Sequence, residues 1–169
     1  MKELISSGLE ALGLTGSVPP DAAEKLAEYG RLLLEKNQVM NLTAIRDEAG
    51  VARLHMLDCA ALLPCADLTG ARTLLDVGTG AGFPGLPLKI LLPQLDVTLL
   101  DSLNKRVDWL NEVSAQLGLT GVRAIQGRAE EKALEKSMRD SFDLVTARAV
   151  ADLRLLSELC LPFVKVGAV

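Results

Sequence analysis

The sequence predicts an α/β fold in which a helical N-terminal cap precedes a doubly wound, mainly parallel sheet. From Thr73 onward, strand-like apolar runs alternate with helical patterns, and repeated β–α–β units of this length imply a parallel sheet with helices on both faces. Before Thr73, apolar residues recur at helical spacing. We therefore expect a helical cap over residues 1–66 and a Rossmann-like domain over residues 67–169.

Turn and capping residues divide the cap into helices. Three helices are expected there, at residues 1–12, 20–36 and 47–63. Asp21, directly after two prolines, marks the start of the second helix. The segment 37–43 interrupts the helical pattern with amide and hydroxyl side chains that favour turns. Asp47 can cap the third helix, which is expected to stop before Pro64.

The second part of the chain alternates strands and helices. The expected elements are strand 73–77, helix 85–92, strand 96–101, helix 104–117, strand 122–126, helix 130–136, strand 142–147, helix 151–160 and the start of a strand at 163–166. Right-handed crossovers place the first strand inside the sheet and put ligands beyond the carboxyl ends of the strands.

Composition and charge exclude several classes of protein. The net charge of −4 argues against a general nucleic-acid binder, although a local basic patch remains compatible with it. No apolar stretch approaches the roughly 20 residues that span a bilayer, and the N-terminal segment carries acidic residues that a signal peptide lacks. The three cysteines have no metal-like spacing. We expect reduced thiols, no metal, no membrane association and a cytoplasmic location.

A glycine-rich turn follows the first strand of the predicted sheet. Gly78, Gly80, Gly82 and Gly85 lie between an apolar run and a helical pattern. Glycines at such a turn allow positive φ and let the backbone approach a ligand, and the following helix presents free N–H groups. The last three of these glycines also fit the dinucleotide fingerprint G-x-G-x-x-G. The turn therefore predicts a nucleotide-like cofactor.

Three details favour S-adenosylmethionine over NAD as that cofactor. The carboxylate of Asp76 would repel a pyrophosphate at the turn and suits a cationic or amine-bearing ligand. Phe83 and Pro84 place bulk where a pyrophosphate needs bare backbone. Asp101 ends the second strand, about 20 residues beyond the turn, where an acidic residue binds ribose hydroxyls in nucleotide folds. The alternative role for Asp101 is a cap at the end of its strand.

Other polar residues follow the third and fourth strands. Ala129 and Glu130 come after the third strand, so they are expected at the ligand edge, although Glu130 also suits the first turn of a helix. Arg148 comes after the fourth strand, as a residue of the pocket lip or as a surface charge. Lys105 and Arg106 begin a helix, where the dipole disfavours cations. That misfit suggests contact with an RNA phosphate, and solvated charges are the alternative.

The sequence resembles the RsmG (GidB) family over most of residues 25–167. The resemblance is carried by DVGTGAGFPGLPL, LLDSLNKRVDWL, GRAEE and FDLVTARAV, with LLLEKNQVMNLTAIRD and RLHMLD upstream. This family methylates guanine N7 in small-subunit ribosomal RNA, so the resemblance implies the S-adenosylmethionine-dependent methyltransferase fold. The family continues through further strands that complete its sheet, whereas this chain stops near the fifth strand. We therefore expect a C-terminally truncated form.

The resemblance assigns roles to individual residues. It implies that Gly78 and Phe83 contact S-adenosylmethionine at the turn, and that Asp101 binds the ribose. It implies that Ala129 and Glu130 frame the adenine, and that Arg148 lies near the reacting end with a possible positioning role. Together with the turn residues, the predicted cofactor-binding set is Asp76, Gly78, Gly80, Phe83, Asp101, Ala129, Glu130 and Arg148.

Methyl transfer to guanine N7 needs no general base, because N7 carries an exposed lone pair and no proton. We therefore expect in-line displacement without a catalytic acid or base. His55, the single histidine, is expected to be a structural hydrogen-bond partner, with Asp58 or an asparagine of residues 37–43 as its partner.

The implied partner is the small ribosomal subunit with its 16S ribosomal RNA. Candidates for RNA contact are Asn41, Lys105, Arg106 and Arg123, and the protein is expected to be a monomer. Three alternatives remain open from the sequence. They are a methyltransferase of another substrate, a cofactor-binding regulatory domain without catalysis, and an NAD(P) oxidoreductase.

Overall fold

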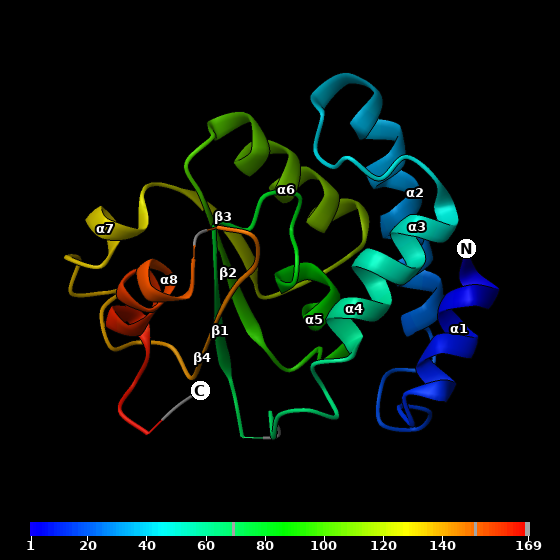
Figure 1. Cartoon of the computed structure of the whole chain (residues 1–169), viewed down its shortest axis with the longest axis horizontal. Helices are drawn as coiled ribbons and strands as arrows, with labels where there is room; N and C mark the ends of the chain where they lie inside the picture. Colours follow the sequence, from blue (N-terminus) through cyan, green and yellow to red (C-terminus); the bar gives the residue numbers. More distant parts are fainter. Residues whose placement is uncertain (69, 151, 168–169) are drawn as a thin grey trace.

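A four-stranded parallel sheet forms the centre of the molecule, with helices on both of its faces (Figure 1). The computed structural model describes residues 1–68, 70–150 and 152–167. The strand order is β3-β2-β1-β4, so the first strand lies inside the sheet. The predicted α/β class and doubly wound parallel sheet are confirmed.

The strands pair in register, so their carboxyl ends meet at one edge. Their bounds are β1 Thr73–Val77, β2 Asp96–Asp101, β3 Val122–Gln126 and β4 Leu144–Ala147. Val77 pairs with Leu100 on one side and with Ala147 on the other. Asp101 pairs with Gln126. The residues that follow these four strands therefore share one side of the molecule.

Successive side chains of a strand project from opposite faces of the sheet, so the apolar residues pack in two separate core clusters. Leu74 packs in the core cluster that holds Leu86 and Leu110, from α5 (Gly85–Leu91) and α6 (Asn104–Gln116). Leu75 packs in a second cluster with Met138. On that second face, α7 (Ala129–Lys132) contacts α8 (Leu153–Cys160), and α8 contacts β4.

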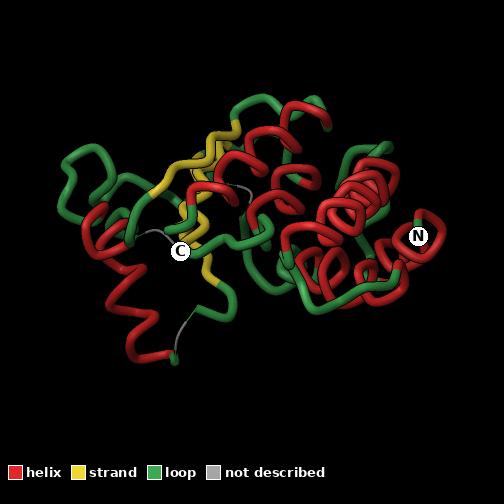
Figure 2. Tube along the Cα trace, turned by 90° about the horizontal axis from the view of Figure 1, so that it is seen from above, coloured by secondary structure: helices red, strands yellow, loops and turns green. Residues whose placement is uncertain are grey.

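The N-terminal helices pack on the α5 side of the sheet. They are α1 (Lys2–Ala11), α2 (Ala22–Met40), α3 (Glu48–Val51) and α4 (Asp58–Ala60), with a π-helical segment, Ala52–Leu57, between the last two. Figure 2 shows the helices around the N-terminus lying to one side of the strands. Tyr29, Leu33 and Met56 are fully buried in the same cluster as Leu74, so the cap and the sheet share one apolar core.

Several predicted boundaries differ from the structure. The second helix continues to Met40, because the buried amide of Asn37 is satisfied inside the helix by the backbone of Thr43, and Asn41 then ends the helix at φ 50°. The third helix ends at Ala60 rather than near residue 63, and α7 is shorter than the predicted helix at 130–136.

The predicted fifth strand is reduced to a single bridge in the described residues. Leu161–Phe163 forms a 3-10 turn, and Val164 makes an isolated parallel bridge with Phe142. Two backbone hydrogen bonds make this bridge, from the Phe142 N–H to the Phe163 carbonyl at 3.0 Å and from the Lys165 N–H to the Phe142 carbonyl at 2.9 Å. The predicted start of the helix at residue 151 lies outside the described residues.

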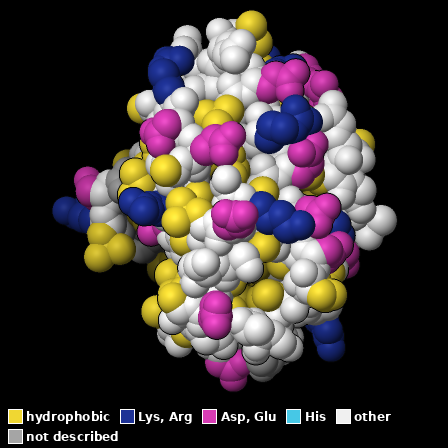
Figure 3. Space-filling model, turned by 90° about the vertical axis from the view of Figure 1, so that its right-hand side faces the viewer, with side chains coloured by type: hydrophobic (Ala, Val, Ile, Leu, Met, Phe, Trp, Pro, Cys, Tyr) yellow, Lys and Arg dark blue, Asp and Glu magenta, His cyan; other side chains and the backbone are white. Residues whose placement is uncertain are grey.

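The outer face of the cap carries interspersed acidic and basic side chains (Figure 3). Ion pairs such as Lys2–Glu24 at 2.8 Å and Arg31–Glu28 at 2.7 Å account for part of this pattern. This face therefore offers no continuous basic field. Among the described residues, no helix has the length and hydropathy needed to cross a membrane.

Candidate functional site

Asp76 fixes the glycine turn after β1 from the interior of the protein. Gly78, Gly80 and Gly82 all have positive φ, at 65°, 59° and 101°. The fully buried Asp76 carboxylate accepts hydrogen bonds from Thr79 Oγ1 at 2.6 Å and from the Gly85 N–H at 3.0 Å. These bonds hold the two ends of the turn together.

The Asp76 carboxylate is fully buried and has a third hydrogen-bond partner. Thr146 Oγ1, from β4, donates to its other oxygen at 3.1 Å. Burial raises the pKa of Asp76 to about 6, against the opposing effect of these three hydrogen bonds. The structure gives the side chain a clear role in shaping the turn, and its predicted contact with the cofactor stays a prediction.

Asp101 connects the end of β2 to the glycine turn. Its Oδ2 accepts from the Gly80 N–H at 2.9 Å, and its Oδ1 accepts from the Leu103 N–H at 2.9 Å. Arg106 Nη1 lies 3.6 Å from Oδ2. Asp101 thus caps the end of its strand, as the alternative proposed. A carboxylate has about four lone-pair sites, so two acceptor sites remain for a ligand.

A hollow of about 330 Å³ at this edge brings together four predicted cofactor residues. Gly78, Asp101, Ala129 and Glu130 line it. Val150, from the loop after β4, covers Gly78 so closely that a Cβ on the glycine would lie 2.7 Å from Val150 Cγ2. Of the turn glycines, Gly78 lines this hollow, and the role of the turn as a cofactor cradle stays a prediction.

Phe83 and Arg148 lie in a different environment. Phe83 is 4% exposed, with its ring stacked on His55 at 4.4 Å and tilted against Tyr29 at 5.3 Å. The Arg148 guanidinium lies 5.1 Å from the centre of the Phe83 ring. Arg148 lines a second hollow, of about 490 Å³, together with Pro84. The predicted cofactor residues therefore form two groups rather than one.

His55 is a hydrogen-bond partner, as predicted, but its partners differ from the expected ones. It contacts Arg148 Nη2 at 2.8 Å and Thr43 Oγ1 at 2.8 Å, rather than Asp58 or an asparagine. Burial, and then the Arg148 charge, lower the pKa of His55 to about 4. Asp58 instead accepts from Arg148 at 3.1 Å. The sequence features that could have indicated this cluster are the single histidine and the arginine that follows β4.

The candidates for RNA contact do not gather at one place. Asn41 is exposed at the end of α2, and Lys105 is exposed in the first turn of α6. Arg106 is turned toward Asp101. Arg123 lies near the start of β3 and donates from Nε to Thr98 Oγ1 at 3.0 Å, away from the carboxyl edge. Arg123 is therefore separated from the other three.

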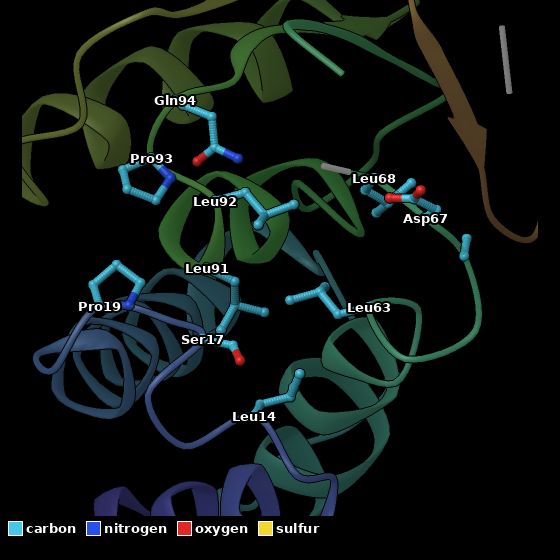
Figure 4. A pocket seen from close by; sticks show the side chains of 11 residues that line it. Leu14, Ser17, Pro19, Leu63, Asp67, Leu68, Leu91, Leu92, Pro93 and Gln94 are labelled. Atoms are coloured by element: carbon cyan, nitrogen blue, oxygen red, sulfur yellow. The ribbon is translucent and has the colours of Figure 1, made fainter. Parts of the chain in front are cut away.

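A larger hollow, of about 640 Å³, lies at the opposite end of the fold, where β2 begins (Figure 4). Leu14, Leu63, Leu91 and Pro93 give it a mostly apolar wall. It contains none of the predicted site residues. Within the described part of the chain, no group of three His, Cys, Asp or Glu side chains is placed to hold a metal ion.

Comparison with a solved structure agrees with the fold. The SAH-bound methyltransferase of Podospora anserina aligns with a TM-score of 0.53 at 20% identity, covering 78% of this chain and 51% of that one. At this identity, the likeness concerns the fold alone.

Sequence comparison identifies the family. The chain is 48% identical over 166 residues to the ribosomal RNA small subunit methyltransferase G of Alkaliphilus metalliredigens, covering 98% of this chain and 69% of the relative. It is 44% identical over 165 residues to the protein of that name from Clostridium perfringens, covering 98% and 68%. The family model described as rRNA small subunit methyltransferase G matches residues 22–169. The chain therefore belongs to the rRNA small subunit methyltransferase G (GidB) family.

Proposed function

We propose that this protein transfers a methyl group from S-adenosylmethionine to ribosomal RNA of the small subunit, at N7 of a guanine. The observation that carries the proposal is the hollow at the carboxyl edge, where Gly78, Asp101, Ala129 and Glu130 come together in a member of this family. S-adenosylmethionine supplies an electrophilic methyl group on a sulfonium. No redox step is required of the chain.

The residues around the hollow fit such a cofactor. Gly78 lines the hollow without a side chain, so a ligand can approach the main chain at this residue. Asp101 is 4% exposed and holds its carboxylate at the lip, with acceptor sites suited to the two ribose hydroxyls. Ala129 is half-buried beside it and offers an apolar surface to an adenine ring.

The remaining residues would orient the reactants. Asp76 holds the turn from inside the protein, with Thr79 and Gly85 as partners. Arg148 presents a guanidinium, a group that binds carboxylates such as that of the methionine part. Alignment of nucleophile, methyl and sulfur then carries the reaction, because guanine N7 has no proton to remove. A neutral His55 with both ring nitrogens engaged is consistent with a reaction that uses no base.

The RNA would approach the carboxyl edge rather than the outer face of the cap. Lys105 is exposed in the first turn of α6, shortly after the carboxyl end of β2, whereas the outer face of the cap has mixed charges (Figure 3). Asn41 is exposed at the end of α2. RNA is bound largely through its phosphates and its shape, so a few cations near the reacting base suffice for an acidic protein. We propose that the protein acts as a monomer on the small ribosomal subunit.

The test begins with equilibrium titration of the protein with S-adenosylmethionine and, separately, with NAD. Asp101→Ala should weaken S-adenosylmethionine binding by at least about tenfold, because it removes hydrogen bonds to a charged acceptor. Asp96→Ala is the matched control, since Asp96 is an exposed acid at the other end of the same strand. Equal affinity of the two variants would remove the ribose role of Asp101.

The second arm measures methyl incorporation into small ribosomal subunits from a strain that lacks this modification, followed by mapping of the methylated nucleotide. Incorporation at a guanine N7 supports the proposal. Binding without transfer to RNA would favour a regulatory domain or a methyltransferase of another substrate. Preference for NAD would overturn the cofactor assignment.

A further inference from the structure

His55 joins the cap to the residue that follows β4. It lies in the π-helical segment Ala52–Leu57, and it is the single histidine of the chain. Its Nδ1 lies 2.8 Å from Arg148 Nη2, and its Nε2 lies 2.8 Å from Thr43 Oγ1. Its ring stacks on Phe83 with centroids 4.4 Å apart and an interplanar angle of 12°. Three sides of the imidazole are therefore held by named partners.

The partners decide which nitrogen carries the proton. A guanidinium has only donors, so the Nδ1 of His55 must be the acceptor in its contact with Arg148. The proton of the neutral ring is then on Nε2, which donates to Thr43 Oγ1. That hydroxyl oxygen also accepts from the Ile45 N–H at 3.2 Å. The ring thus has one defined tautomer in this arrangement.

Thr43 is itself fixed by α2. The side-chain amide of Asn37, which is 2% exposed, donates to the Thr43 carbonyl at 2.9 Å and accepts from the Thr43 N–H at 2.9 Å. A chain of contacts therefore runs from Asn37 through Thr43 and His55 to Arg148. Each link is a hydrogen bond of ordinary length, so displacement at one link is felt at the next.

Arg148 depends on the cap for its position. Its Nη1 donates to Asp58 Oδ2 at 3.1 Å and to the Leu54 carbonyl at 3.3 Å, in addition to the contact with His55. All three acceptors lie within residues 54–58 of the cap, in the π-helical segment and at the start of α4, while Arg148 follows a strand of the sheet. The guanidinium also lies over the face of Phe83, 5.1 Å from its centroid.

We propose that His55 is a positioning residue, whose Nδ1 lone pair holds the Arg148 guanidinium over Phe83 and so completes the cofactor site from the cap. The proposal rests on the proposed function, because the contact of Arg148 with S-adenosylmethionine is part of it. A protonated His55 would lose this lone pair and would face the Arg148 charge at hydrogen-bond distance. The neutral ring is consistent with the pKa of His55, which burial and Arg148 hold near 4.

Three substitutions separate the roles of the ring. In His55→Asn, the amide oxygen can lie near the former Nδ1 and accept from Arg148. In His55→Gln, the longer side chain places its amide near the former Nε2, which serves Thr43 instead. His55→Phe keeps an aromatic ring against Phe83 and removes both polar contacts.

Equilibrium titration with S-adenosylmethionine, together with a melting curve for each variant, measures the effect. We expect the dissociation constant to rise about tenfold in His55→Phe and in His55→Gln. This is the lower end of the range for a lost hydrogen bond to a charged group. The lower end applies because Asp58 still holds Arg148 in both variants. His55→Asn should recover most of that loss, with an increase of no more than about threefold. Equal losses in all three variants, in parallel with melting, would indicate a purely structural residue and overturn the proposal.

Nitrogen-15 NMR of the imidazole tests the contact without cofactor or RNA. With one histidine in the chain, the imidazole signals need no residue assignment, and the couplings of the two nitrogens to the ring protons distinguish Nδ1 from Nε2. We expect a neutral ring protonated on Nε2 at pH 6, and an upward movement of the titration midpoint in Arg148→Gln. A ring protonated on Nδ1, or a midpoint indifferent to Arg148→Gln, would overturn the inference. Failure of the wild-type protein to bind S-adenosylmethionine would instead overturn the proposed function, and the NMR result distinguishes the two.

Discussion

Neutral His55 predicts how the stability of the protein changes with pH. The pKa of His55 is about 4 in the folded protein, against an ordinary value of 6.5. Between these values the unfolded chain binds a proton at this residue and the folded protein does not, so the free energy of unfolding decreases as the pH falls. The stability contributed by the neutral imidazole is fully present above pH 6.5 and is lost progressively as the pH falls toward 4. Below pH 4 it changes no further.

The size of this effect follows from the difference between the two pKa values. At about 1.4 kcal/mol per pKa unit, a decrease from 6.5 to about 4 corresponds to roughly 3 to 4 kcal/mol. Solvent reaches part of the half-buried ring, and screening reduces the effect, so we expect about 1 to 2 kcal/mol. The charged groups that act on the ring are Arg148 and Asp58, and the titratable Tyr29 packs against the same Phe83 ring.

Asp76 opposes this trend, so the wild-type curve alone is not diagnostic. Its pKa is about 6 in the folded protein against an ordinary 3.8, because burial disfavours the charged form. The folded protein therefore binds the proton more readily, and stability from Asp76 is lost as the pH rises from 3.8 through 6. The variant His55→Asn keeps Asp76 and removes the titrating imidazole, so the difference between the two proteins isolates His55.

The assay is urea denaturation of the wild-type protein and of His55→Asn at pH 7.5 and pH 5.0, with two-state behaviour checked by two probes. We expect the wild-type protein to lose about 1 to 2 kcal/mol more than the variant between these pH values. Parallel losses in the two proteins would refute the reasoning, because the imidazole would then titrate equally in the folded and unfolded states.

Three further predictions concern the turn, a buried lysine and the start of the sheet. In urea denaturation, Gly78→Ala should destabilise the protein by about 1 to 2 kcal/mol more than Gly118→Ala. Both glycines have φ near 65°, but only at Gly78 would the new Cβ lie 2.7 Å from Val150 Cγ2. Equal losses of stability in the two variants would contradict this contact. Lys89→Met should lower the free energy of unfolding by about 2 kcal/mol, since the ammonium of Lys89 donates to two backbone carbonyls, each at 2.6 Å, beyond the end of α5; an unchanged melting temperature would argue against that role. Asp143→Asn should reduce the loss of stability on acidification below pH 4, because hydrogen bonds from Lys165 and the backbone hold the pKa of Asp143 below its ordinary 3.8; identical acid titrations of the two proteins would disprove it.

The sequence predicts the edge of the sheet well, because its signals are local. Apolar runs identify the strands, and parallel strands bring their carboxyl ends to one side. Asp101 ends such a run, Gly78 directly follows one and Ala129 comes three residues after one, so their neighbourhood could be predicted without knowing the packing. The same reasoning could not predict the environment of the Asp76 side chain. That environment depends on the face of the strand from which the side chain projects, and Asp76 is fully buried.

Contacts between the cap and the sheet could not be predicted in this way. His55 and Arg148 are 93 positions apart in the sequence, and no periodic pattern joins them. The path of α2 beyond residue 36 was missed for a related reason: Asn37 favours a turn in isolation, but its amide is satisfied inside the helix by Thr43. In both cases a polar side chain finds a tertiary partner that outweighs its local preference.

The loop after β4 contacts both the cap and the glycine turn at the edge of the sheet. Ala147 and Arg148 line the hollow beside Pro84, whereas Ala149 and Val150 line the hollow with Asp101. The chain crosses between the two hollows at Ala149, whose φ of 55° is unusual for a residue with a side chain and costs about 1 to 2 kcal/mol. Contacts on both sides of the crossing hold the chain in this conformation, namely the cap at Arg148 and the glycine turn at Val150. A cofactor lying along the turn would therefore meet a loop whose position is set partly by the cap, so substitutions in the cap should alter cofactor binding without touching the cofactor.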